Sequence, residues 1–154
     1  MTWSEVLKDK SLQDLPYKIE LNEWGQIVMS PSSNRHGLFQ MKVGFALKSQ
    51  LGAGEVLTEC SILTSAGVKV PDVAWCSEDF IRSHGFETPF TSAPELCVEI
   101  LSPSNSQKEM DEKMKLYFEA GCVEVWLVTE EGDIRYYNPQ GQIDNTSYDI
   151  ELSL

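Results

Sequence analysis

The order of apolar and polar positions predicts an α/β protein that opens with a β-hairpin. The first 16 residues read as a short helical or irregular lead-in. Residues 17–22 and 26–30 read as two strands, and Gly25 lies between them in the turn. The N-terminal part of the chain is therefore expected to form a hairpin before the first long helix.

Further along the chain, five segments have the apolar and β-branched content of strands: residues 55–63, 69–76, 95–101, 123–129 and 134–137. The segment 95–101 is almost continuously apolar, which is typical of a central strand covered on both faces. Residues 77–94 are polar, contain two prolines and are expected to be irregular.

A first long helix is predicted at residues 34–51 and ends at Gly52. One of its faces carries four residues at helical spacing: His36, Phe39, Val43 and Leu47. A second apolar stripe lies on nearly the opposite side: Leu38, Met41 and Phe45. A helix that is apolar on two sides is often buried twice, so we expect a core contact and a subunit contact in a homodimer or higher homo-oligomer.

A second helix is predicted at residues 107–120. Ser106 and Glu109 have the spacing of a capping box, and Gly121 closes the helix. Because strand-like segments lie on both sides of this helix, the pattern predicts a strand–helix–strand crossover. These elements predict a single domain over residues 1–154, with a mixed central sheet flanked by helices.

Two carboxylates interrupt apolar strands and are the first candidates for chemistry. Asp72 lies in a segment with Val70 and Ala74, and Glu99 lies in the central strand. Acidic residues are seldom buried without a partner, and neighbouring strands are about 4.8 Å apart. Two such carboxylates at one level can hold a hard cation such as Mg²⁺ or Mn²⁺. The alternative is structural: Asp72 in a turn after proline, and Glu99 in a salt bridge at a strand end.

Helical spacing distinguishes two lysines that follow Glu99. Lys113 falls on the arc of the second helix that contains Met110 and Tyr117, whereas Lys115 falls on the opposite side. An inward lysine requires an anionic partner or a function, unless it extends along the helix edge to water. Asp72, Glu99 and Lys113 together suit hydrolysis of a phosphodiester bond, with metal bound by the two carboxylates.

At this point the sequence resembles a known family. The resemblance is carried by four segments: Val-Pro-Asp72, Pro94-Glu-Leu-Cys-Val-Glu99-Ile-Leu-Ser-Pro-Ser104, Lys113-x-x-x-Tyr117-x-x-x-Gly121 and Glu124-Val-Trp126. Together they look like the Uma-two family of restriction-endonuclease-type proteins, in the PD-(D/E)xK nuclease superfamily. The upstream Ile19-Glu20-Leu21, Gly25, Ser30-Pro31 and His36 also fit, and the resemblance covers roughly residues 15–137.

The resemblance implies a restriction-endonuclease-like core of helix, three-stranded meander, helix and strand. It implies that Asp72 and Glu99 are the metal-binding acids of a DNA endonuclease and that Lys113 is its lysine. The superfamily pattern has a lysine two positions after the second acid, where this chain has Leu101. The family places the lysine on the following helix instead, which agrees with the helical-face argument for Lys113.

Four further residues are candidates around the same centre, and two of them, Glu20 and His36, fit the family pattern. Glu20 is expected near the metal, and His36 is expected on the inward face of its helix, where a lone histidine is more often a hydrogen-bonded core residue. Gln107 and Tyr117 are expected to border the site, without an assigned role.

Overall charge and cysteine usage limit these hypotheses. The net charge of −12 opposes tight binding to nucleic acid, whose phosphates are contacted by Lys and Arg. The four cysteines lack metal-ligand spacing and are expected to be buried thiols. No long apolar run or signal peptide is present, so we expect a cytoplasmic protein without membrane contact. Besides an endonuclease, the sequence allows a catalytically silent nuclease-fold protein that binds or assembles.

Overall fold

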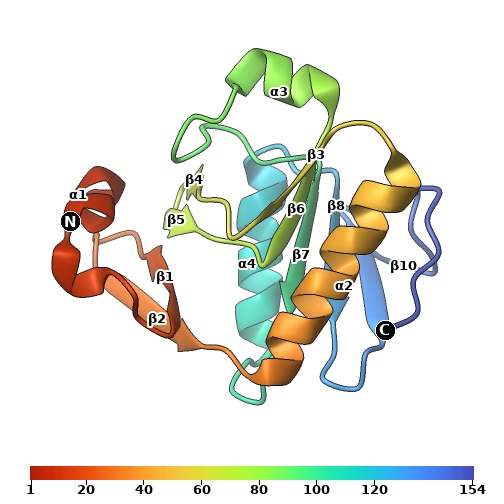
Figure 1. Cartoon of the computed structure of the whole chain (residues 1–154), viewed down its shortest axis with the longest axis horizontal. Helices are drawn as coiled ribbons and strands as arrows, with labels where there is room; N and C mark the ends of the chain where they lie inside the picture. Colours follow the sequence, from red (N-terminus) through yellow and green to blue (C-terminus); the bar gives the residue numbers. More distant parts are fainter.

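A six-stranded mixed sheet forms the centre of the computed structural model, which describes residues 1–154 (Figure 1). In spatial order its strands are β10 (Gly141–Ile143), β9 (Ile134–Asn138), β8 (Glu124–Val128), β7 (Leu96–Ile100), β6 (Val73–Cys76) and β3 (Glu55–Thr58). Strands β7 and β8 are parallel, and every other neighbouring pair is antiparallel. The predicted mixed central sheet is confirmed.

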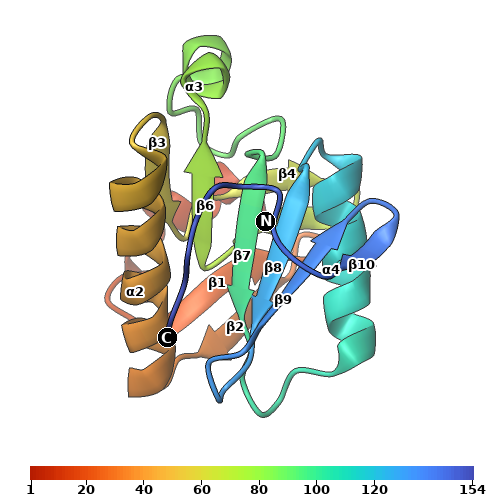
Figure 2. The ribbon, with the colours of Figure 1, turned by 90° about the vertical axis from the view of Figure 1, so that its right-hand side faces the viewer.

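Two long helices cover opposite faces of this sheet, α2 (Asn34–Leu51) and α4 (Gln107–Glu119), as Figure 2 shows. Under α2 the core contains Val43, Leu47 and Trp126, all fully buried. Under α4 it contains Met114 and Tyr117, together with the buried cysteines. Both faces of β7 and β8 are therefore apolar, which explains the nearly continuous apolar run in each strand. None of the helices is long and apolar enough to cross a membrane.

Helix α4 connects the two parallel strands and fixes the geometry on its side of the sheet. Its capping box is present: the Glu109 backbone N–H donates to Ser106 Oγ, and the Ser106 N–H donates to the Glu109 carboxylate. The predicted crossover between β7 and β8 is confirmed. The order α2, β3, β6, β7, α4, β8 matches the expected helix, meander, helix and strand.

Two small hairpins lie beside the sheet (Figure 1). The first is β1 (Tyr17–Leu21) with β2 (Ile27–Pro31), preceded by α1 (Trp3–Lys8) and a 3₁₀ turn at Lys10–Leu12. The second is β4 (Ile62–Thr64) with β5 (Gly67–Lys69). The hairpins approach each other closely at Gly67, where a Cβ atom would collide with the Leu21 carbonyl oxygen. The predicted N-terminal hairpin is confirmed.

Two predicted strands were too long, and the backbone explains why. Residues 55–63 divide into β3 and β4 because Glu59 has a φ of 55°, which turns the chain out of the sheet. Residues 69–76 divide into β5 and β6 at Pro71, which has no N–H to donate to a ladder. Asp72 therefore lies in the connection before β6 and not within a strand.

Two elements were absent from the sequence-based prediction. Helix α3 (Glu78–His84) lies in the segment that was expected to be irregular, and Ser77 caps it by accepting a hydrogen bond from the Phe80 N–H. Strand β10 extends the sheet beyond β9. Both are short, and neither lines the cleft between the β1–β2 hairpin and α4.

The two faces of α2 give a stability prediction. Leu47→Ala is expected to lower the free energy of unfolding by about 2–5 kcal/mol, because Leu47 is fully buried between helix and sheet. Leu38→Ala, on the outer face of the same helix, is expected to change it by less than about 0.5 kcal/mol, since Leu38 is exposed. Urea denaturation followed by circular dichroism measures both. Equal losses in the two variants would contradict this assignment of the faces.

Candidate functional site

Asp72 is fixed by the backbone of the central sheet. Its own N–H donates to the Val98 carbonyl, and its carboxylate oxygen Oδ2 accepts a 2.7 Å hydrogen bond from the Ile100 N–H. The side chain is fully buried. These two hydrogen bonds hold Asp72 beside β7, where Glu99 is the neighbouring acid.

Glu99 projects from β7 toward helix α4. Its Oε1 atom accepts a hydrogen bond of 2.6 Å from the Tyr117 hydroxyl and lies 2.9 Å from Lys113 Nζ. The residue is only 4% exposed, so protein groups replace water around this carboxylate. Asp72 and Glu99, predicted as a pair from sequence, do lie at neighbouring positions.

Lys113 points inward, as the helical spacing predicts. Its Nζ atom lies 2.8 Å from Glu20 Oε1 and 2.9 Å from Glu99 Oε1, and its side chain is 12% exposed. Lys115, two residues further, is 76% exposed and pairs only loosely with Glu119 at 3.8 Å. Lys113 therefore joins the β1–β2 hairpin to the central strand β7.

Glu20 also lies in this cluster and fastens β1 to the chain near Asp72. Its Oε1 atom accepts a 2.7 Å hydrogen bond from the Val70 N–H in addition to the contact with Lys113. The residue is buried. Lys113 thus links Glu20 to Glu99, and the expected place of Glu20 near a metal stays a prediction.

Lys18 is the residue that sequence reasoning missed. Its Nζ atom lies 2.8 Å from Asp72 Oδ1 and 3.2 Å from Glu99 Oε2, so it bridges the two predicted acids. A signal was present: Lys18 and Glu20 alternate in β1 with Ile19 and Leu21, which pack in the small hairpin core. Strand alternation places Lys18 and Glu20 on one face, and only Glu20 was singled out.

His36 lies at the start of α2 and contacts Asp72 from the other side. Its Nε2 atom is 3.2 Å from Asp72 Oδ1, and its Nδ1 atom is buried without a hydrogen-bond partner. One turn later, the Gln40 side-chain amide donates to the Asp72 backbone carbonyl. The first two turns of α2 therefore hold the loop that carries Asp72.

The two remaining candidates differ in position. Tyr117 is fully buried, and its hydroxyl donates a hydrogen bond to the Glu99 carboxylate from within the core. Gln107 is exposed in the first turn of α4, where its amide donates to Asp111. Gln107 does not contact the cluster formed by the other candidates, because its side chain lies along the helix surface.

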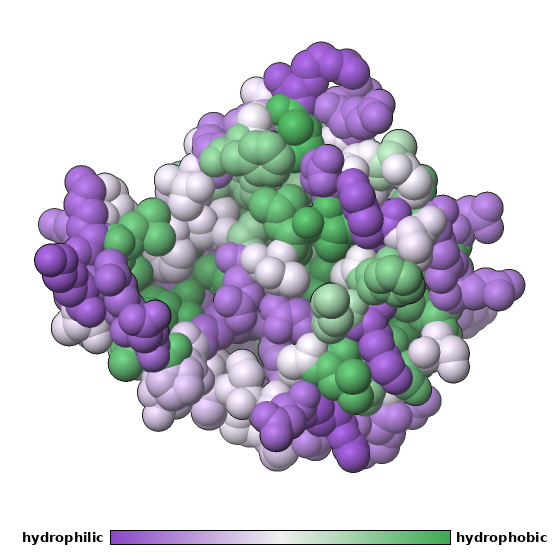
Figure 3. Space-filling model, in the orientation of Figure 1, coloured by the Kyte–Doolittle hydropathy of each residue, from purple (hydrophilic) through white to green (hydrophobic).

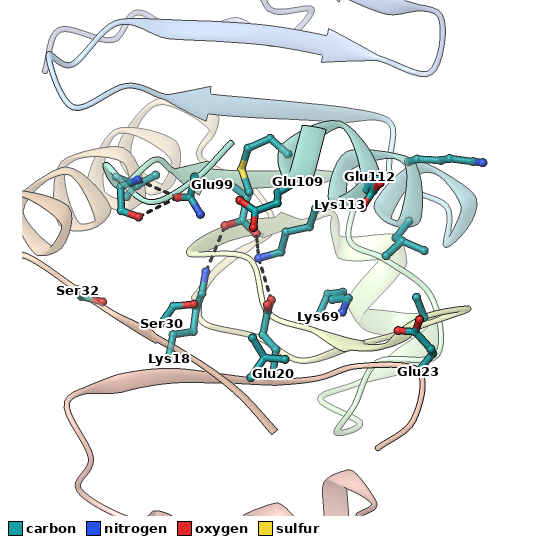
Figure 4. A pocket seen from close by; sticks show the side chains of 18 of the residues that line it. Lys18, Glu20, Glu23, Ser30, Ser32, Lys69, Glu99, Glu109, Glu112 and Lys113 are labelled. Carbon is teal, nitrogen blue, oxygen red and sulfur yellow. Dashed lines mark hydrogen bonds and ion pairs between the residues drawn. The ribbon is translucent and has the colours of Figure 1, made fainter. Parts of the chain in front are cut away.

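A cleft of about 570 Å³ lies between the β1–β2 hairpin and α4, and five of the residues described above line it: Lys18, Glu20, His36, Glu99 and Lys113. Figure 4 shows Lys18, Glu20, Glu99 and Lys113 pointing toward one another in it. The charged residues that line it are Lys18, Lys69, Lys113, Lys115, Glu20, Glu23, Glu99, Glu109, Glu112 and Glu119. Asp72 does not line the cleft but lies beneath Lys18.

The pKa values of the two acids, Asp72 and Glu99, are shifted in opposite directions. Burial raises the pKa of Asp72, but the His36 hydrogen bond and the Lys18 charge outweigh it and hold that pKa well below its usual range. In Glu99, burial prevails over Lys113 and Lys18, and the pKa is raised. For the Lys18 ammonium group, burial by itself lowers the pKa. The negative charges of Glu99 and Asp72 outweigh burial, and the pKa is raised. Asp72 and Lys18 are therefore both charged at neutral pH.

These shifts predict how stability depends on pH. Asp72→Asn is expected to lower the free energy of unfolding by about 3–5 kcal/mol at pH 7, since it removes one partner of a buried ion pair. Because the pKa of Asp72 is lower in the folded chain, its contribution is complete above about pH 4 and is lost as pH falls further. The gap between wild type and Asp72→Asn should therefore narrow toward pH 3.

Urea denaturation between pH 3 and pH 7 measures this gap. Glu112→Gln serves as the control, because Glu112 is exposed and its replacement should have a small effect throughout. A gap that stays constant or widens toward pH 3 would show that the Asp72 carboxylate does not stabilise the fold through its charge.

Comparison with known proteins agrees with this architecture. A solved structure described as a putative nuclease belonging to DUF820 from Anabaena variabilis ATCC 29413 superposes with a TM-score of 0.72. The two chains are 21% identical, and the alignment covers 99% of this chain and 89% of that chain. At this identity the likeness establishes the shared fold. No match is found among curated proteins.

The Uma2 family model, described as "Putative restriction endonuclease", matches residues 9–151. The matched range contains the β1–β2 hairpin, the central sheet, both long helices and every charged residue of the cluster. Because the match extends over nearly the whole chain, this protein belongs to the Uma2 family.

Proposed function

We propose that the chain is a metal-dependent endonuclease that hydrolyses DNA phosphodiester bonds through Asp72, Glu99 and Lys113. The observation that supports this most directly is that Asp72 and Glu99 share a single cationic partner at the floor of the cleft, the ammonium group of Lys18. Two carboxylates that already converge on one positive charge have the arrangement a hard metal ion needs. Membership of the Uma2 family supports the same reaction class.

The donor chemistry of this pair suits Mg²⁺ or Mn²⁺. Both ligands are carboxylate oxygens, and Mg²⁺ is commonly held by one or two carboxylates while it keeps several waters. No group of three or more His, Cys, Asp or Glu side chains is arranged to hold a metal. Asp72 and Glu99 would therefore hold the ion together with water. When bound, it would supply an activated water and stabilise negative charge on the phosphate.

The protein groups around the pair have separate tasks. Lys113 places a positive charge beside Glu99 in the cleft, where it can neutralise charge that develops on a phosphate. The Tyr117 hydroxyl fixes the Glu99 carboxylate, and His36 fixes that of Asp72. Glu20 holds Lys113 in position through their ion pair. These contacts keep the acids oriented before any substrate arrives.

The charge of the cleft makes a cation necessary for this substrate. Six glutamates and four lysines line it, so it carries an excess of negative charge, in keeping with the net charge of −12. A phosphodiester is repelled by such a surface unless cations offset it. DNA binding is therefore expected to depend strongly on the divalent ion.

Cleavage assays test the proposed centre. Purified protein with Mg²⁺ or Mn²⁺ is expected to cleave DNA offered in several forms, and Asp72→Ala, Glu99→Ala and Lys113→Met should each reduce the rate by about 100-fold or more. Lys115→Met is the matched control, because Lys115 is on the same helix but points to water. Cleavage that survives both acid substitutions would refute the proposed site.

A second candidate function is assembly without catalysis. The outer face of α2 exposes Leu38, Met41 and Phe45, which are 50%, 70% and 70% exposed, respectively. Hydrophobic residues lie among hydrophilic ones over this region in Figure 3. Neighbouring apolar side chains on a monomer surface favour contact with another chain. We therefore propose that α2 forms a homodimer interface, in an active or in a catalytically silent protein.

Sedimentation equilibrium at micromolar concentration tests the interface. The wild-type chain is expected to be a dimer or higher oligomer, and Phe45→Glu is expected to be monomeric, because a charge in an apolar contact is strongly unfavourable. Phe86→Glu is the control, since Phe86 is also exposed but lies away from α2. A monomeric wild type would exclude this face as a stable interface. Mn²⁺ binding that disappears in Asp72→Ala would count against a silent assembly protein.

A further inference from the structure

Lys18 has no role in the proposed catalysis by Asp72, Glu99 and Lys113, yet it contacts both acids. Its Nζ atom bridges the two proposed metal ligands at 2.8 and 3.2 Å, and its side chain is only 9% exposed. An ammonium group is a compact point charge that donates to oxygen. It thus occupies the place between the carboxylates that a small cation would also require.

The other oxygen contacts of the two acids come from within the fold. Asp72 Oδ2 is held by the Ile100 N–H and Oδ1 by His36, while Glu99 Oε1 is held by Tyr117 and Lys113. Asp72 is fully buried and does not line the cleft, whereas Lys18 does. Lys18 therefore covers Asp72, and an ion that enters from the cleft meets the ammonium group first.

We propose that Lys18 is an internal counter-ion that holds the cation position between Asp72 and Glu99, and that a divalent ion binds only by displacing it. The proposal rests on the assignment of Asp72 and Glu99 as metal ligands. Without a positive charge between them, two buried carboxylates would repel each other. The ammonium group removes this repulsion in the metal-free protein, and for the same reason it weakens metal binding, because the two cations compete for the same oxygens.

The fold allows this exchange without loss of the hairpin. The β1 strand remains attached through the Glu20 contact with the Val70 N–H at 2.7 Å and through the small core that contains Leu21 and Val68. Lysine has a flexible four-carbon stem, so its ammonium group can leave the carboxylates by rotation of the side chain. Figure 4 shows Lys18 at the hairpin side of the cleft, opposite α4. A displaced Lys18 therefore stays in the cleft.

Calorimetric titration of the full chain with Mn²⁺ tests the proposal directly. Lys18→Met is expected to bind Mn²⁺ at least about tenfold more tightly than wild type, because the competing charge is gone. Lys69→Met is the matched control: Lys69 lines the same cleft, but its Nζ donates to the Leu21 carbonyl and contacts neither acid. Its affinity should stay within about twofold of wild type. The gain in Lys18→Met should disappear when Asp72→Asn is added.

Removing the Lys18 charge leaves two buried acids without their shared partner, which lowers stability. A second variant and a second measurement therefore accompany the titration. Lys18→Gln keeps a donor near both carboxylates but removes the charge, and it should also bind Mn²⁺ more tightly than wild type. In thermal unfolding, both variants should be less stable than wild type in EDTA, and Mn²⁺ should raise their Tm more than that of wild type.

The outcomes separate this inference from the proposed function. If Lys18→Met and Lys18→Gln bind Mn²⁺ no more tightly than wild type or Lys69→Met, while binding still requires Asp72, the counter-ion role is wrong and the metal site stands. If none of the proteins binds Mn²⁺, both the counter-ion role and the metal-dependent function are wrong. An equal gain in Lys18→Met and Lys69→Met would show a general effect of cleft charge and would also overturn the role of Lys18.

Discussion

The ion pairs among Lys18, Glu20, Asp72, Glu99 and Lys113 are the constraint on which the architecture of the cleft depends. Three carboxylates and two ammonium groups are enclosed there, and buried charges persist only when they are paired. Each lysine bridges two acids from different segments of the chain. The β1–β2 hairpin, the central strand β7 and helix α4 are consequently joined by charge as well as by apolar contact.

The sheet provides the rigid frame that makes these contacts specific. Because β7 and β8 are parallel, the chain between them must cross one face of the sheet, and α4 does so directly over Glu99. Helix α2 covers the opposite face and brings His36 and Gln40 to Asp72. The acids are thus held from both faces of the sheet, while only the cleft side between the hairpin and α4 remains open.

Electrostatics connects this frame to the proposed chemistry. The cleft is acidic, and the chain as a whole carries a net charge of −12, so a polyanionic substrate cannot be attracted by the protein alone. A divalent ion bound by Asp72 and Glu99 would add positive charge within the cleft. If Lys18 holds that position beforehand, the buried acids are neutralised in the metal-free state, and the site keeps its geometry until an ion arrives.

The sequence by itself determined the elements with strong periodicity and the residues that break it. The long helices, the hairpin at Gly25 and the crossover follow from local patterns of apolar residues, caps and glycine, which depend on near neighbours in the chain. The inward direction of Lys113 follows from helical geometry in the same way. Asp72 and Glu99 stood out because charge is rare within apolar runs.

Only the tertiary structure decided what these residues contact. Pro71 and the left-handed Glu59 divided two predicted strands, and helix α3 formed in a segment without strong periodicity. Lys18 reaches Asp72 across 54 positions of the chain and Glu99 across 81, and no local pattern contains such distances. Gln107 lies on α4 as predicted, yet its side chain donates to Asp111 along the helix and contacts neither Asp72 nor Glu99. Periodicity shows which way a side chain points, but the partner it meets depends on how distant elements pack.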